Sequence, residues 1–284
     1  MAGRREVLAG AVGGALWLAG CRSDGDGAAP STGAASSTSG GQAAPVQKHR
    51  YGTDPSQFAE LTLPEGGEAV PLAVIIHGGF WRAQYALSLG RPLAATLPTC
   101  GWAAWNVEYR RVGNGGGYPA TLDDVAAAID ALADLDAPLD LSRVVTIGHS
   151  AGGHLAAWAA TRDEPVVAVT GVVSQAGVLD LRQSAADRLG GGATQELLGG
   201  EPAAVGERYD EASPIEHLPL GVPILCVHGR DDSIVPISQS DAFVTAAVAA
   251  GDDAELAAVE GDHFVVIDPE HEAWTLVLDW LTSR

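Results

Sequence analysis

The chain has 284 residues, of which 46% are hydrophobic and 18% charged, a composition that can form a globular core. Its formal net charge of −20 argues against nucleic acid as a partner, because no basic surface is available to neutralise phosphates. The three cysteines are too few for a disulfide scaffold. The sequence leaves open whether Cys100 and Cys226 pair, although the apolar run around Cys226 favours a buried free thiol.

The N-terminal segment has the features of an export signal. Two arginines precede an apolar stretch at residues 7–19, which is too short to span a membrane comfortably. The stretch leads into Leu-Ala-Gly-Cys, which resembles the lipobox of bacterial lipoproteins. We therefore expect a signal peptide over residues 1–20 and a lipidated Cys21 that anchors an exported protein on the extracytoplasmic face of the cell membrane. The alternative is an ordinary cleaved signal with an incidental cysteine, and the export route, Sec or twin-arginine, stays open.

A linker and one domain are expected after Cys21. The rest of residues 21–48 is rich in Gly, Ala, Ser, Thr and Pro, which favours a flexible tether. Beyond it, short apolar runs that end in turn residues predict buried strands. They are Leu72–His77, Gly101–Tyr109, Arg143–Gly148, Val169–Ser174, Pro223–His228 and Glu255–Val259.

Helical patterns alternate with these strands. They cover Ala120–Leu135, Gly152–Ala160, Ser238–Ala250 and Pro269–Leu281. Alternation of strand and helix predicts an α/β domain over residues 49–284, with a mostly parallel central sheet and helices on both faces. Active sites of such sheets lie at the carboxyl ends of the strands, where the motifs below fall.

A candidate nucleophile follows the strand that ends at Gly148. Gly148-His149-Ser150-Ala151-Gly152 matches the pattern G-x-S-x-G, which is a weak signal by itself. Its position between a strand and a helix strengthens it, because glycines allow the sharp turn that lifts the serine side chain out of the sheet. We expect Ser150 to be the nucleophile; the alternative is a serine that only caps the helix.

A candidate oxyanion hole follows the strand Leu72–His77. Its sequence is His77-Gly78-Gly79-Phe80-Trp81, and glycines let backbone N–H groups approach an oxyanion. One donor is expected from Gly79 or Phe80 and the other from Ala151. His77 is expected to shape the loop. Phe80 and Trp81 either line a substrate pocket or cover the core.

Two arginines lie beside these strand ends. Arg82 follows the oxyanion loop and could meet a substrate carboxylate. Arg110 follows another strand, and we expect it to pair with Asp123 or Asp124 and so fix the next helix. The histidines near the serine, His149 and His154, do not have the spacing of a helical zinc site, so no metal is expected.

A serine nucleophile needs a base that removes its proton, and that base needs a hydrogen-bond acceptor on its far side that orients it. His263 lies between the last strand and the last helix, which is the position of the base in hydrolases with this chain order. The orienting carboxylate is Asp232, in His-Gly-x-x-Asp-x-x-Val-Pro, with Asp231 as the alternative. Asp262 is adjacent to His263 in sequence and therefore poorly placed to bond its ring.

These motifs resemble the α/β-hydrolase superfamily over about residues 49–284. HGGFW and GHSAGG are similar to the branch of esterases, lipases and kynurenine formamidases. The resemblance implies hydrolysis of a carboxylic ester or an N-formyl arylamine by Ser150, Asp232 and His263, with no cofactor. The export signal, and a stretch over Asp180–Ser213 with little material for a large lid, both favour the esterase.

Three functions follow in order of preference. The first is a serine hydrolase that cleaves carboxylic esters of small substrates through an acyl-enzyme. The second is an arylformamidase with the same residues. The third is a surface lipoprotein that binds a ligand without catalysis, since a fold does not fix a function.

Overall fold

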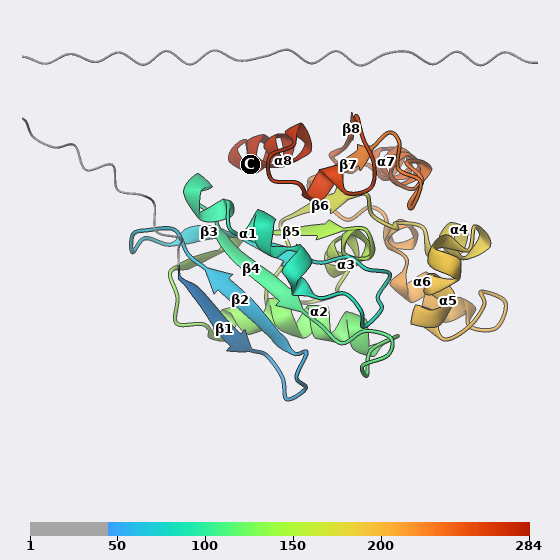
Figure 1. Ribbon diagram of the computed structural model, residues 1–284, viewed down its shortest axis with the longest axis horizontal. Coiled ribbons are helices and arrows are strands. Elements are labelled where there is room, and N and C mark those ends of the chain that lie inside the picture. The colour runs from blue at the N-terminus through green and yellow to red at the C-terminus, as the bar shows by residue number, and fades with distance from the viewer. Residues whose placement is uncertain (1–44) are drawn as a thin grey trace, which may run out of the picture. The chain divides into compact units, whose positions relative to one another are not determined.

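The computed structural model describes residues 45–284 of the chain (Figure 1). The expected signal peptide, the lipidated Cys21 and most of the expected linker lie outside the described residues. Within residues 45–284, no helix has both the length and the apolar character that a membrane crossing requires.

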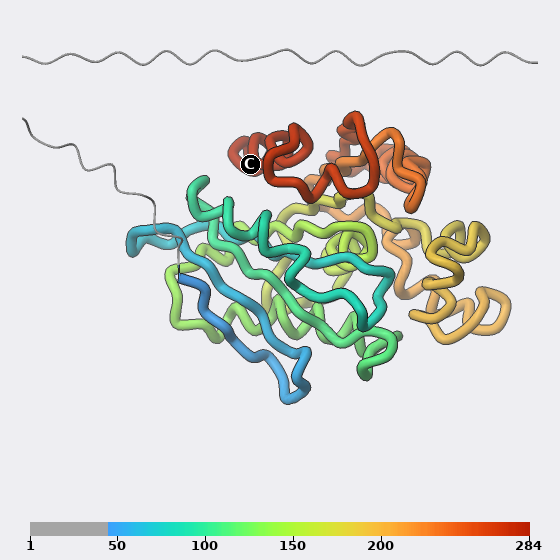
Figure 2. Tube along the Cα trace, in the orientation of Figure 1, coloured from blue at the N-terminus to red at the C-terminus, as the bar shows by residue number. Residues whose placement is uncertain are grey.

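Eight strands form one sheet in the order β1-β2-β4-β3-β5-β6-β7-β8. Strands β3 to β8 run parallel to one another, and β2 pairs antiparallel with both β1 and β4. Strand β1, in blue in Figure 2, lies at one edge of the sheet and β8 lies at the other. The bounds are β1 Val46–Arg50, β2 Phe58–Thr62, β3 Val70–Ile76, β4 Ala103–Glu108, β5 Leu139–His149, β6 Gly171–Gln175, β7 Ile224–Gly229 and β8 Ala254–Val259.

All six predicted strands are confirmed. Five of them are buried over most of their length, whereas the edge strand β8 is partly exposed. The two antiparallel strands at the N-terminal edge were not predicted. Four of the five residues of β1 are exposed, so its sequence VQKHR carries no apolar pattern. Residues 46–48, which we assigned to the linker, instead belong to this edge strand.

Helices cover both faces of the sheet, as expected. One face packs on α2, α3 and α7, and the other on α1 and α8. The α-helices are α1 Arg91–Ala94, α2 Ala120–Asp130, α3 Ala151–Ala159, α4 Leu181–Ala186, α5 Ala193–Leu198, α6 Gly206–Ala212, α7 Ser238–Ala250 and α8 Glu272–Thr282. Short 3-10 turns complete the helical segments: η1 Leu87–Leu89, η2 Leu97–Cys100, η3 Ala131–Asp134, η4 Leu189–Gly191, η5 Pro214–His217 and η6 Val265–Ile267.

The stretch between β6 and β7 holds helices that were not predicted. We expected little material for a large lid over Asp180–Ser213, and the segment forms the short helices α4, α5 and α6, which gather at one side of the sheet in Figure 1. Each is only six or seven residues long, too short for a clear apolar period. They form a small helical insertion beside the carboxyl ends of the strands.

The two cysteines of the described region are not paired. Cys100 is exposed and Cys226 is buried in β7, and both are free thiols. Burial raises the pKa of Cys226 to about 12, so its thiol stays protonated and unreactive at neutral pH. This confirms a buried free Cys226.

Candidate active site

Ser150 occupies a strained turn between β5 and α3. Its φ of 56° and ψ of −118° lie outside the regions that L-residues prefer. The two glycines of the motif permit the turn. A Cβ at Gly148 would lie 2.0 Å from the carbonyl oxygen of Gly152, and a Cβ at Gly152 would lie 2.0 Å from that of Ile76 in β3. The G-x-S-x-G pattern is therefore required by the close approach of α3 to β3 and β5.

The loop after β3 lies against Ser150. A Cβ at Gly78 would lie 3.0 Å from the Cβ of Ser150, so this residue has no room for a side chain. The backbone then turns through positive φ at Gly79 (113°) and Phe80 (54°). Within the described part of the chain, the backbone N–H groups of Phe80 and Ala151 donate no hydrogen bond. They are available as donors to an oxyanion, and Ala151 also begins α3, where a helix carries partial positive charge.

The ring of His263 forms a hydrogen bond with the carboxylate of Asp232. The Nδ1 of His263 lies 2.6 Å from Oδ2 of Asp232, and both side chains are almost fully buried. The same carboxylate accepts the backbone N–H groups of Ile234 and Val235, each at 2.8 Å, and lies 3.2 Å from Nε2 of His228. Burial raises the pKa of Asp232, but hydrogen bonds from His228 and His263 outweigh it and leave the pKa well below its usual range. Asp232 is thus a charged acceptor behind the His263 ring, whose Nε2 makes no hydrogen bond within residues 45–284.

The other two carboxylates considered from the sequence do not reach His263. Asp231 is exposed, and its backbone N–H donates to the carbonyl of Gly261. The side chain of Asp262 accepts the backbone N–H of Phe264 at 2.9 Å. The structure therefore brings Asp232, and neither neighbour, to the histidine.

Ser150 and His263 line one cavity of about 130 Å³. No hydrogen bond joins their side chains within residues 45–284, and such bonds in ligand-free enzymes often tighten only when substrate binds. The mouth is apolar, because Phe264, Tyr85 and Leu89 keep 55%, 42% and 36% of their surface exposed. The lining residues are Gly79, Phe80, Tyr85, Leu89, His149, Ser150, Ile234, His263, Phe264 and Ile267.

Two residues expected in the substrate pocket lie elsewhere. Trp81 is 1% exposed, and its indole N–H donates to Nδ1 of His154 at 3.2 Å, so it packs in the core. Arg82 forms two hydrogen bonds to the carboxylate of Glu196 in α5, at 2.7 and 2.9 Å. Neither side chain lines the cavity. Trp81 thus takes the core position, one of its two expected places, whereas the expected place of Arg82 in the substrate pocket is corrected. Arg82 instead links the oxyanion loop to the helical insertion.

His149 has a position that the sequence did not reveal. It lines the cavity, and its Nε2 donates to the backbone carbonyl of His263 at 2.9 Å. Burial lowers its pKa to about 3, so the ring is neutral. The only sequence signal was its place inside the G-x-S-x-G turn; the side chain reaches the loop after β8 that carries His263. His149 therefore supports the segment that carries His263.

The chain resembles known proteins in sequence and in fold. A family model described as BD-FAE matches residues 60–246, about two thirds of the chain. Esterase LipC of Mycobacterium tuberculosis is 28% identical over 219 residues, which cover 68% of this chain and 53% of LipC. The chain thus spans about half the length of the curated relatives it matches.

Solved structures share the fold. A truncated carbohydrate esterase from gut microbiota has a TM-score of 0.70 at 24% identity, over 83% of this chain and 94% of that one. An esterase from the Planctomycetes species Thermogutta terrifontis, with propionate bound, has a TM-score of 0.66 at 24% identity, over 85% and 93%. These likenesses show an α/β-hydrolase fold, as expected from the motifs.

Proposed function

Because this chain belongs to the BD-FAE family, we propose that it is a serine carboxylesterase that hydrolyses short-chain carboxylic esters. One observation carries the proposal. Ser150, held on a strained turn, lines the same cavity as His263, whose ring is bonded to the buried carboxylate of Asp232. The relative LipC is named an esterase, which supports the same activity.

Acylation follows from the positions of these groups. The free Nε2 of His263 removes the proton of Ser150 as Oγ attacks the ester carbonyl carbon. The carbonyl oxygen becomes an oxyanion, which accepts hydrogen bonds from backbone N–H groups of Phe80 and Ala151. The intermediate then collapses: His263 returns its proton to the leaving alcohol, and the acyl group stays on Ser150.

Deacylation repeats these steps with water. His263 removes a proton from a water molecule as that water attacks the acyl carbon, and the same N–H groups hold the second oxyanion. The bond to Oγ breaks, Ser150 regains a proton from His263, and the carboxylic acid leaves. Asp232 stays ionised throughout and stabilises the imidazolium that forms twice in each cycle.

The cavity favours small acyl groups. Its volume of about 130 Å³ lies below the about 300–1,000 Å³ of typical small-molecule sites, so a long acyl chain would not fit within it. The exposed aromatic side chains at its mouth, Phe264 and Tyr85, offer an apolar surface to the alcohol part. Acetyl to butyryl esters are therefore the preferred substrates. The propionate bound to the Thermogutta terrifontis esterase is of this size.

The test uses p-nitrophenyl acetate, butyrate and octanoate, with an N-formyl arylamine as the competing substrate class. Wild type is compared with Ser150→Ala and with Ser142→Ala, an exposed serine at the other end of β5. We expect the short esters to turn over fastest and only Ser150→Ala to lose activity. Folded protein that hydrolyses the formamide but no ester, or full activity in Ser150→Ala, would exclude the proposal.

We also propose that the protein is exported and anchored in the cell membrane by lipid on Cys21. The signal-like residues 1–20 and the Leu-Ala-Gly-Cys sequence support this. Membrane fractionation of a bacterial host that expresses the full chain tests it. The wild type should sediment with membranes and Cys21→Ser should not; equal distributions would refute the anchor.

A further inference from the structure

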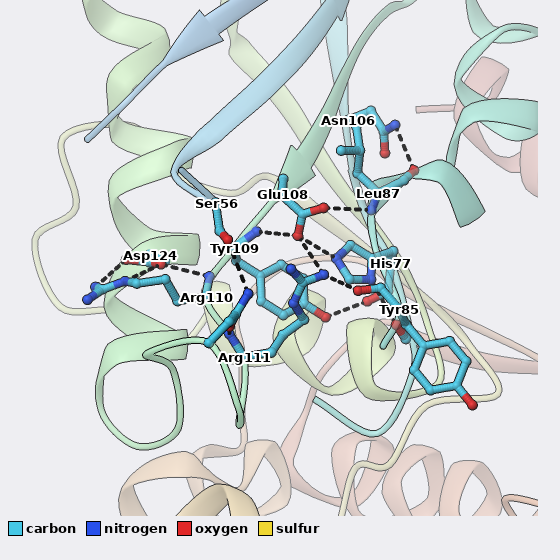
Figure 3. A network of polar contacts seen from close by, with 12 residues as sticks. Ser56, His77, Tyr85, Leu87, Asn106, Glu108, Tyr109, Arg110, Arg111 and Asp124 are labelled. Carbon is cyan, nitrogen blue, oxygen red and sulfur yellow. Dashed lines mark hydrogen bonds and ion pairs between the residues drawn. The ribbon is translucent and has the colours of Figure 1, made fainter. Parts of the chain in front are cut away.

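A buried polar network lies behind the oxyanion loop (Figure 3). At its centre is Glu108, the last residue of β4, which is 4% exposed. One carboxylate oxygen lies 2.8 Å from Nη1 of Arg111, 3.1 Å from the backbone N of Tyr109 and 3.3 Å from Nε2 of His77. The other oxygen accepts the backbone N–H of Leu87 at 3.0 Å. The contacts from Arg111, Tyr109 and Leu87 are donors whatever the state of the His77 ring.

Glu108 is ionised in this setting. Burial raises its pKa, but hydrogen bonding and charge from His77, the backbone bond from Leu87 and the charge of Arg111 outweigh it and lower the pKa. An ionised carboxylate can only accept hydrogen bonds.

His77 therefore faces acceptors at both ring nitrogens. Its Nε2 faces Glu108 at 3.3 Å, and its Nδ1 lies 2.8 Å from the backbone carbonyl oxygen of Gly78. A neutral imidazole has one donor and one acceptor, so it would direct a lone pair at one of these oxygens. Only the imidazolium satisfies both contacts. The ring also stacks on Tyr109, with centroids 4.4 Å apart, and the Tyr109 hydroxyl donates to the His77 carbonyl at 2.7 Å.

The bond to Gly78 fixes the direction of the next N–H group. A peptide unit is planar and trans, so the C=O of Gly78 and the N–H of Gly79 point in opposite directions. Because the ring of His77 holds that carbonyl in the interior, the N–H of Gly79 points the other way. Gly79 lines the cavity beside Ser150, so its N–H is a third donor for the oxyanion, in addition to those of Phe80 and Ala151.

We propose that His77 is a positioning residue: as an imidazolium held by Glu108, it directs the Gly79 N–H into the oxyanion hole and keeps a positive charge behind it. The proposal rests on the ester hydrolysis proposed above. Glu108 balances one of the two cations, His77 and Arg111, so the network retains a net positive charge near a developing oxyanion. The charged and titratable groups that contact His77 are Glu108 and Tyr109, with Arg111 on the far side of the carboxylate.

The neighbouring Arg110 has a separate partner. Its guanidinium lies 2.6 and 2.8 Å from the carboxylate oxygens of Asp124 in α2 (Figure 3). This confirms the pairing with one of the two aspartates expected from the sequence. It also means that the charge of Arg110 is neutralised away from His77.

The protonation of His77 can be read directly from the resting protein. We expect nitrogen NMR of the full chain, labelled at the histidine rings, to show protons on both ring nitrogens of His77 at pH 7. In Glu108→Gln we expect one ring nitrogen without a proton, since the partner is then neutral. A single ring proton in the wild type would overturn the proposal, whether or not the protein hydrolyses esters.

Kinetics test the positioning role. One oxyanion donor is worth about 10²–10³ in kcat, so we expect His77→Ala to lower kcat about a hundredfold with KM for p-nitrophenyl acetate changed less than about twofold. Glu108→Gln, which removes the charge and keeps the direction of the loop, should lower kcat about tenfold.

The control is Asp130→Asn, which breaks the part-buried ion pair with Arg162 (3.0 Å) at the far end of α2. It should lose stability and keep kcat. Folded His77→Ala and Glu108→Gln with wild-type kcat, or an equal loss in Asp130→Asn, would overturn the proposal. No ester turnover in the wild type would refute the proposed function, and the nitrogen NMR would still decide the state of His77.

Discussion

Substitution of Gly152 by alanine tests how closely the fold sets the position of Ser150. The added Cβ would lie 2.0 Å from the carbonyl oxygen of Ile76 and 2.6 Å from that of His77, whereas ordinary contact begins at 3.4 Å. The start of α3 would therefore move from β3 by about 1 Å or more, and a misplacement of about 1 Å can cost about 10² in rate. Because both opposing atoms are backbone, no side chain can rotate away to relieve the contact.

Stability should fall together with activity. Overpacking of a core costs about 1–3 kcal/mol, and a domain of this size loses about 2–4 °C in Tm for each kcal/mol. We expect Gly152→Ala to lower kcat for p-nitrophenyl acetate about a hundredfold, with a lower Tm in thermal denaturation. The matched control is Gly67→Ala, since no atom lies within 4 Å of a Cβ there. If Gly152→Ala retained wild-type kcat, the packing explanation of the motif would be wrong.

Three further predictions concern the residues around the cavity. Asp232→Asn should lower kcat about 10⁴-fold. Folding lowers the pKa of Asp232, so the stabilisation from its ionised carboxylate is complete above the ordinary pKa of 3.8 and is lost as the pH falls through the folded pKa. The stability advantage of wild type over Asp232→Asn in thermal scans should therefore shrink below about pH 4. A stability difference that stays constant with pH would contradict this. Arg82→Ala should leave KM unchanged for acidic and neutral esters. It should lower the free energy of unfolding by less than about 1 kcal/mol, since the ion pair of Arg82 with Glu196 is partly exposed. A KM raised only for acidic esters would show that Arg82 binds substrate. His149→Ala should lower kcat about tenfold, because the segment that carries His263 loses its hydrogen bond. The pH–rate profile above pH 5 should keep its shape, because the His149 ring is already neutral there. A titration step lost from or added to that profile would contradict the neutral state of His149.

The centre of the sheet was predictable because its strands are buried on both faces. A run such as Val70–Ile76 is apolar at nearly every position, so the signal does not depend on what packs against it. The edge strand β1 is polar and exposed, and only its pairing with β2 makes it a strand. The helices α4 to α6 are too short to show a period, so tertiary contacts decide them.

The site was predictable where geometry follows from chain order. Ser150 and His263 each follow a strand, and the carboxyl ends of parallel strands meet at one edge of the sheet. The motif already favoured Asp232 over Asp231, and the turn after β7 supplies the physical reason, because it buries the carboxylate of Asp232 and exposes Asp231. Trp81 could not be placed from the motif alone, because its own backbone adopts a positive φ of 53° and its side chain lies in the core.

The central claim is that Ser150 is the nucleophile whose side-chain oxygen becomes acylated. The most direct measurement is mass spectrometry of the protein after reaction with a p-nitrophenyl alkylphosphonate, in which a serine Oγ attacks phosphorus and p-nitrophenolate leaves. The account predicts one adduct, on the peptide that contains Ser150, with loss of esterase activity in step with its formation and no adduct in Ser150→Ala. An adduct on another residue, or full inactivation without modification of Ser150, would contradict it.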